Sequence, residues 1–120
     1  MRRIAVIEDN ADNRLLVEAI LEGQYALAEY GSGPEALAAL PDAVPDLVLL
    51  DISLPEMDGP EVLRRIRSHP ALTRLPVIAL TAHAMAGDRE RYLAAGFDDY
   101  VSKPILDEEI LLTAIGRLLP

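Results

Sequence analysis

The sequence predicts an α/β fold in which helices cover both faces of a parallel β-sheet. Five short apolar runs recur along the 120 residues, at 4–7, 25–30, 46–50, 76–80 and 99–102. Stretches with helical periodicity separate these runs, and no long loop interrupts the alternation. The first, third and fourth runs are the most apolar, which is typical of strands buried on both faces. We therefore expect five strand–helix units.

The intervening stretches carry helix signals of their own. Leu16 and Ile20 lie four residues apart on the apolar side of the first stretch. Pro34 opens the second, where its missing N–H removes no helical hydrogen bond. Asp58 and Asp107 precede two others as N-caps, because a carboxylate there accepts a backbone N–H. The helices are predicted over residues 11–22, 34–40, 58–68, 84–95 and 107–119.

Length and composition limit the possible classes of protein. With 51% hydrophobic residues, the chain can bury a core, and we expect one domain over residues 1–120 with no output domain. The absence of cysteine excludes disulfides and thiolate metal sites. No apolar run is long enough to span a membrane, and the Met1-Arg2-Arg3 start leads directly into a strand rather than a signal peptide. A cytoplasmic protein is expected.

The charge balance argues against nucleic acid or an anionic membrane as a partner. Twenty acidic and 11 basic residues give a formal net charge of −9, which both surfaces would repel. One phenylalanine and four tyrosines offer little aromatic surface for stacking bases.

Polar residues follow several of the predicted strands. Glu8 and Asp9 end the first apolar run, and Asp51 ends the third. Carboxylates gathered at one edge of a parallel sheet repel one another, and a bound cation relieves this repulsion. Thr81 and Lys103 follow the fourth and fifth runs, adding a hydroxyl and an ammonium group to that edge.

Four motifs make the chain similar to a known family. They are Ile7-Glu8-Asp9-Asn10, Asp51-Ile52-Ser53-Leu54-Pro55-Glu56-Met57-Asp58-Gly59, Ala79-Leu80-Thr81-Ala82 and Tyr100-Val101-Ser102-Lys103-Pro104. With their spacing they resemble the receiver domain of a two-component response regulator, in particular the single-domain type and the receivers of hybrid sensor kinases. The resemblance, rather than the spacing, implies a flavodoxin-like (βα)5 fold with strand order 2-1-3-4-5.

The resemblance implies a phosphorylation site. Asp51 would accept a phosphoryl group from a phosphohistidine of a histidine kinase or histidine phosphotransfer protein. Mg²⁺ would be held by Asp9, by Asp51, by Glu8 through water and by the main-chain carbonyl of Ser53. Lys103 would bind one phosphoryl oxygen. Thr81 would bind another.

The resemblance also implies a switch. Thr81 would move toward the phosphoryl group, and Tyr100 would turn into the vacated space, while Tyr92 was interpreted as an edge tyrosine. A cis bond before Pro104 would direct the preceding lysine inward. Gly59 is interpreted as serving a tight loop.

Partner surfaces are predicted from the same resemblance. Ala11, Asn13 and Leu15 on the first helix are candidates for contact with the phosphate donor, and His83 could border the phosphoryl group. The last helix carries more apolar residues than one buried face needs, so part of it is expected to contact a downstream protein or a second copy. A monomer and a phosphorylation-dependent homodimer both remain open.

Three alternatives are weighed against a freestanding, non-enzymatic switch. The chain could be a receiver cut from a larger regulator or hybrid kinase. A haloacid-dehalogenase-like phosphatase also uses a strand-end aspartate with Mg²⁺, but it normally has a second aspartate where this chain has Ser53. A pseudo-receiver that docks without phosphorylation usually lacks one of the key residues, and all are present here.

Overall fold

The computed structural model describes residues 1–82, 87–103, 105 and 107–119. It contains a five-stranded parallel sheet in the order β2-β1-β3-β4-β5, which confirms the predicted fold and strand order. The strands are β1 (Arg3–Ile7), β2 (Ala26–Tyr30), β3 (Leu47–Asp51), β4 (Val77–Thr81) and β5 (Asp99–Ser102). The helices are α1 (Ala11–Leu21), α2 (Gly33–Ala39), α3 (Gly59–Ser68), α4 (Asp88–Ala95) and α5 (Glu108–Leu118), with a short 3₁₀ helix, η1, at Leu40–Asp42.

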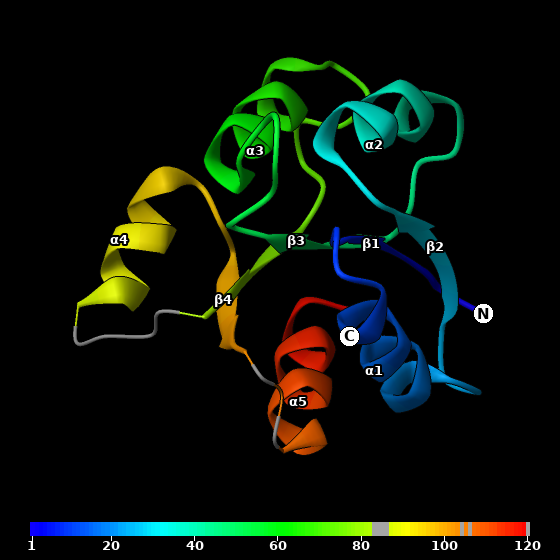
Figure 1. Cartoon of the computed structure of the whole chain (residues 1–120). Helices are drawn as coiled ribbons and strands as arrows, with labels where there is room; N and C mark the ends of the chain where they lie inside the picture. Colours follow the sequence, from blue (N-terminus) through cyan, green and yellow to red (C-terminus); the bar gives the residue numbers. More distant parts are fainter. Residues whose placement is uncertain (83–86, 104, 106, 120) are drawn as a thin grey trace.

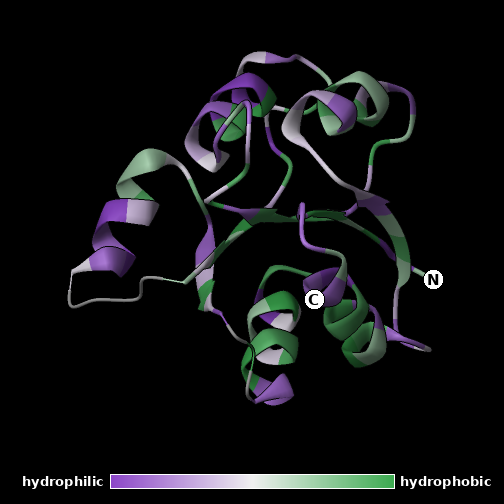
Figure 2. Ribbon diagram, in the orientation of Figure 1, coloured by the Kyte–Doolittle hydropathy of each residue, from purple (hydrophilic) through white to green (hydrophobic). Residues whose placement is uncertain are grey.

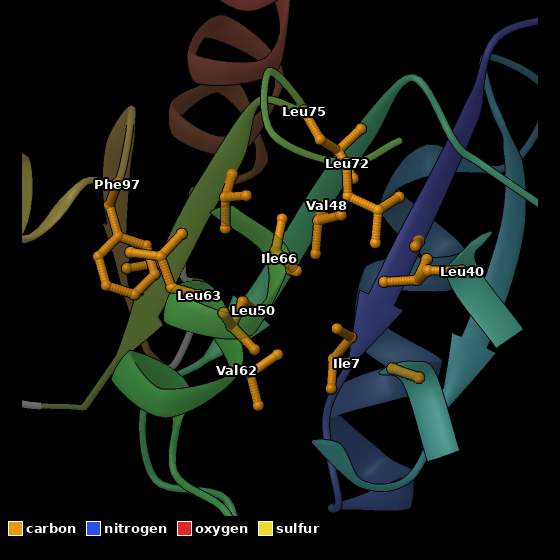
Figure 3. Packing of buried hydrophobic residues seen from close by; sticks show 14 of the residues in the cluster. Ile7, Leu40, Val48, Leu50, Val62, Leu63, Ile66, Leu72, Leu75 and Phe97 are labelled. Carbon is orange, nitrogen blue, oxygen red and sulfur yellow. The ribbon is translucent and has the colours of Figure 1, made fainter. Parts of the chain in front are cut away.

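The helices form a layer on each side of the sheet. Figure 1 shows α1 and α5 together on one face, with α2 and α3 on the other and α4 beside β4. Because side chains alternate along a strand, the sheet supplies two separate cores. In β4, Val77 and Ala79 pack toward α2, α3 and α4, whereas Ile78 and Leu80 pack toward α1 and α5. Figure 3 shows the first of these cores, where Leu50 of β3 lies among Val62 and Leu63 of α3.

Hydropathy follows this layering. Figure 2 shows the central strands as largely hydrophobic ribbon, while α4 is mostly hydrophilic. The α4 helix nevertheless buries Tyr92 against the first core. On α5, Leu112, Leu118 and Leu119 pack against the second core, and Ile110 remains 56% exposed. The predicted excess of apolar surface on α5 is therefore mostly used inside the domain.

The predicted helix starts are largely confirmed. Asp58 and Asp107 cap α3 and α5 through their carboxylates. Asn10 and Ser32 cap α1 and α2 in the same way, through side-chain oxygens. The α4 helix was predicted from residue 84 and begins at Asp88, with Gly87 as its N-cap. Residues 83–86, which include His83, lie outside the described part of the chain, as does Pro104.

One arginine ties three segments together at the edge of the sheet where the strands begin. Arg67 of α3 donates from Nη1 to the Leu75 carbonyl (2.6 Å) and from Nη2 to the Gly96 carbonyl (2.9 Å). Arg67 Nη2 also lies 3.1 Å from Oδ2 of Asp98, which accepts the Val77 N–H at 2.8 Å. The end of α4 and the start of β4 are thereby fixed to α3.

Over the described residues, no helix has both the length and the apolar character needed to cross a membrane.

Candidate functional site

Three carboxylates meet at the carboxyl end of the sheet. The β1 and β3 strands are neighbours and pair Ile7 with Leu50, so the residues that follow these two leave the sheet side by side. One carboxylate oxygen from each of Glu8, Asp9 and Asp51 lies within 4.8 Å of the other two. Two distant parts of the sequence therefore supply one acidic cluster, as the resemblance implied.

Glu8 is held by contacts from the start of α1. Its side chain is fully buried, and Asn13 Nδ2 donates to its Oε1 at 2.5 Å. Arg14 donates from Nη1 to the Glu8 main-chain carbonyl at 2.6 Å. Asn13, a predicted candidate for contact with the phosphate donor, orients Glu8 through this hydrogen bond. Leu15, in contrast, is 60% exposed and remains available on the surface of α1.

Lys103 completes the cluster as its cation. Its Nζ lies 3.1 Å from Oδ1 of Asp51 and 3.3 Å from Oε1 of Glu8. The Lys103 side chain is 15% exposed, and its backbone N–H donates to the Thr81 carbonyl at 2.7 Å, extending the β4–β5 pairing. The ammonium group therefore partly neutralises the two buried carboxylates.

The two buried carboxylates of the cluster have pKa values shifted in opposite directions. Burial, and then the neighbouring Asp51, raise the pKa of Glu8 to about 7, although Asn13 and Lys103 act in the opposite direction. Burial, the largest influence, raises the pKa of Asp51, and the hydrogen bond shared with Glu8 lowers it. The Ser53 N–H and Lys103 lower that pKa further, so it falls below the ordinary value of 3.8. Asp51 is consequently the ionised member of the pair at neutral pH, and Glu8 titrates near neutrality.

The loop from β3 to α3 packs tightly against the end of β3. Ser53 N–H donates to Asp51 Oδ1 at 3.1 Å, which fixes the carboxylate. Gly59 N–H donates to the Ile52 carbonyl at 2.9 Å, and a Cβ at position 59 would lie 2.7 Å from the Asp51 carbonyl oxygen and from Ile52 Cα. Gly59 is therefore explained by close backbone approach, whereas the left-handed residue of this loop is Glu56, with φ 64°.

Thr81 and the aromatic residues lie on the α4 side of the strand ends. The hydroxyl of Tyr92 donates to Thr81 Oγ1 at 3.1 Å, and both side chains are buried. The interpretation of Tyr92 as an edge tyrosine is wrong, because its ring packs edge-on against Phe97 and 5.8 Å from the half-buried ring of Tyr100. The spacing of Tyr92 within α4 gives no sequence signal for its hydrogen bond to Thr81, because that bond reaches a different element, β4.

The donor set fits a hard divalent cation. Three carboxylates converge on one point, and Mg²⁺ prefers oxygen ligands and tolerates few protein ligands because it retains waters. Asp9 is the exposed member, so the cluster is open on one side.

Comparisons with known proteins agree with this arrangement. The model of the response regulator receiver domain family matches residues 4–115. The polar-differentiation response regulator DivK of Brucella ovis is 41% identical over 105 residues, which cover 87% of this chain and 85% of that protein. The histidine-protein kinase BarA of Escherichia coli (strain K12) is 40% identical over 89% of the chain, but the match spans only 12% of the kinase.

Solved structures show the same fold. A response regulator described as putative, from Chloroflexus aurantiacus J-10-fl, superposes with a TM-score of 0.90 at 28% identity, covering 98% of this chain and 97% of that one. The receiver domain of the sensor histidine kinase PA1611 from Pseudomonas aeruginosa PAO1 has a TM-score of 0.87 at 35% identity, with the same coverage, and carries a magnesium ion in its active-site cleft. The chain belongs to the family of response regulator receiver domains, the phosphorylation switches of two-component signalling.

Proposed function

We propose that Asp51 is the phosphoryl acceptor of this receiver domain. The observation that supports this is the contact between Lys103 Nζ and Asp51 Oδ1 (3.1 Å) inside the acidic cluster. It keeps one carboxylate ionised, and therefore nucleophilic, at a site where a cation can bind. Glu8, with its pKa raised to about 7, is poorly suited to the same role.

The reaction is a phosphoryl transfer between two side chains. A carboxylate oxygen of Asp51 forms a bond to phosphorus, and the phosphorus–nitrogen bond of the donor phosphohistidine breaks. The electron pair of that bond returns to the imidazole, which takes up a proton. The product is an acyl phosphate; attack of water on its phosphorus breaks the bond to the Asp51 oxygen, releases inorganic phosphate and restores the carboxylate.

Mg²⁺ would be held by Asp9, by Asp51, by Glu8 through water and by the Ser53 carbonyl. When bound, it neutralises the charge that accumulates on the phosphoryl oxygens. Lys103 binds a phosphoryl oxygen as a point charge once the Asp51 carboxylate is phosphorylated. Thr81 reaches a second oxygen after its hydroxyl turns toward the site.

The partners follow from the chemistry. The donor is a histidine kinase or a histidine phosphotransfer protein, and the exposed Leu15 on α1, beside the acidic cluster, is a candidate contact for it. The output is a change in the surface around α4, β5 and α5, read by a downstream protein. Nothing in the cluster requires turnover of a free substrate, so we propose a switch rather than an enzyme.

Labelling with acetyl phosphate in Mg²⁺ tests the assignment. Wild-type protein should gain one phosphoryl group by intact-mass spectrometry, and Asp51→Asn should gain none. Asp42→Asn, an exposed aspartate in η1, is the matched control and should label normally. Excess EDTA should prevent labelling of the wild type. A labelled Asp51→Asn protein would identify a different acceptor, and sustained turnover of p-nitrophenyl phosphate would favour a phosphatase.

A further inference from the structure

The hydrogen bond from Tyr92 to Thr81 joins α4 to the end of β4. The two oxygens are 3.1 Å apart, and the side chains are 7% and 2% exposed. The Tyr92 ring is fixed by Phe97 and Tyr100, with centroids 5.9 Å and 5.8 Å away. A buried, hydrogen-bonded hydroxyl on an otherwise hydrophilic helix is costly unless its contact is maintained.

The direction of Thr81 sets this contact apart from the acidic cluster. Thr81 continues the alternation of Val77 and Ala79, which face α2, α3 and α4. Asp51 continues the alternation of Leu49, which faces α1 and α5. The side chains of Thr81 and Asp51 therefore lie on opposite faces of the sheet. The Thr81 hydroxyl has to turn at the end of β4 to reach a phosphoryl group on Asp51.

We propose that Tyr92 holds Thr81 in its unphosphorylated position and couples the turning of Thr81 to α4. This inference rests on the proposed function, because it takes a phosphoryl group on Asp51 as the competitor for the Thr81 hydroxyl. Phosphorylation must break the Tyr92–Thr81 hydrogen bond. Tyr92 is therefore a positioning residue that acts through Thr81, in addition to the switch role proposed for Tyr100.

The surroundings of Tyr92 explain why α4 responds. The Tyr92 hydroxyl also lies 3.4 Å from Arg91 Nη2, on a side chain that is 66% exposed and paired with Asp88 at 2.9 Å. The Arg91 guanidinium also lies 5.1 Å from the centre of the Tyr92 ring. When Thr81 turns away, the buried tyrosine hydroxyl keeps, among the described residues, the longer contact to Arg91. Movement of the ring and its turn of α4 toward solvent is then favourable, because water can hydrogen-bond to the tyrosine hydroxyl.

The Tyr92→Phe variant tests the proposal, because it removes the hydroxyl and keeps the ring. Beryllofluoride with Mg²⁺ serves as the phosphoryl mimic, and binding is measured by calorimetry. Loss of one competing hydrogen bond should tighten beryllofluoride binding about 2- to 10-fold. Tyr30→Phe is the matched control, since Tyr30 is a partly buried tyrosine packed on the same core, and it should bind as the wild type does.

A double-mutant cycle separates coupling from a general effect on packing. In a Thr81→Ala background, Tyr92→Phe should leave beryllofluoride affinity unchanged, because its partner is already absent. Hydrogen exchange adds a readout on the wild type alone: beryllofluoride should speed exchange of the α4 amides. In Tyr92→Phe these amides should exchange fast before the mimic is added, so that the increment disappears.

The possible failures are distinguishable. Wild-type protein that does not bind beryllofluoride would overturn the proposed function and this inference together. Normal wild-type binding with an unchanged or weakened Tyr92→Phe would overturn the inference alone. An equal effect of Tyr92→Phe with and without the Thr81 hydroxyl would also overturn it, as would α4 amides that ignore the mimic in the wild type.

Discussion

The metal-free protein should lose stability as the pH rises from 5 to 8, because Glu8 has to ionise inside the folded domain. Burial, with Asp51 nearby, raises the Glu8 pKa from 4.5 to about 7 on folding. Between these two values the folded protein binds more protons than the unfolded chain. The stability that protonated Glu8 contributes is therefore fully present below pH 4.5 and is lost as the pH passes through 7.

The magnitude follows from that difference in pKa. Each pKa unit corresponds to about 1.4 kcal/mol, so the whole displacement amounts to about 3 kcal/mol, of which roughly 2.5 kcal/mol falls between pH 5 and 8. Asp51 and Lys103 titrate at other pH values. The lowered pKa of Asp51 affects stability below pH 4, and the raised pKa of Lys103 affects it above pH 10.

Urea unfolding in EDTA, followed by circular dichroism, measures this effect against a Glu8→Gln variant. The glutamine imitates protonated Glu8, so the two proteins should be close in stability at pH 5. At pH 8 the variant should be more stable by about 2–3 kcal/mol. A constant difference between the two proteins from pH 5 to 8 would refute the assignment of the titrating group. Adding Mg²⁺ at pH 8 should restore stability to the wild type by favouring the ionised cluster.

Two glycines give opposite predictions. Gly59→Ala should destabilise the protein by about 1–3 kcal/mol and slow the labelling of Asp51, because the new Cβ would lie 2.7 Å from backbone atoms of residues 51 and 52. A Gly59→Ala variant with the wild-type urea midpoint and labelling rate would contradict this steric explanation. Gly116→Ala should stabilise the protein by about 0.5–1 kcal/mol, because Gly116 is an exposed position within α5 with nothing within 4 Å of a new Cβ; a lowered midpoint in thermal unfolding would contradict it.

Much of the fold could be predicted because each strand carries its own signal. A strand buried on both faces needs an unbroken apolar run, so β1, β3 and β4 were placed to within one residue at each end. The strand order came from the resemblance rather than from physical reasoning about the runs. The later start of α4, at Asp88 instead of residue 84, lies next to residues outside the described part of the chain.

The acidic cluster was predictable for a topological reason. Residues that follow neighbouring parallel strands emerge at the same edge, so Glu8 and Asp51 had to be close once β1 and β3 were adjacent. The contacts made by helices were not predictable in this way. Asn13 orients Glu8, and Tyr92 binds Thr81, through the angle and depth at which α1 and α4 pack. A periodic pattern in one sequence identifies which side of a helix is buried, but it does not specify the polar atom that side will meet.

The Arg67 contacts determine what kind of motion α4 can make. Arg67 fixes the Gly96 carbonyl, immediately after the last turn of α4, and Asp98 fixes the first residue of β4. The end of α4 nearer the acidic cluster is held less firmly, through the contact of Arg89 Nη1 with Asp99 Oδ1 of β5 (3.0 Å) on a side chain that is 51% exposed. Because α4 is anchored most firmly at its C-terminal end, a small displacement at the Tyr92–Thr81 hydrogen bond would become a larger displacement of the first turn of α4. The ion pair between Arg89 in that turn and Asp99 would then have to lengthen, so the same movement would reach the surface at the start of β5.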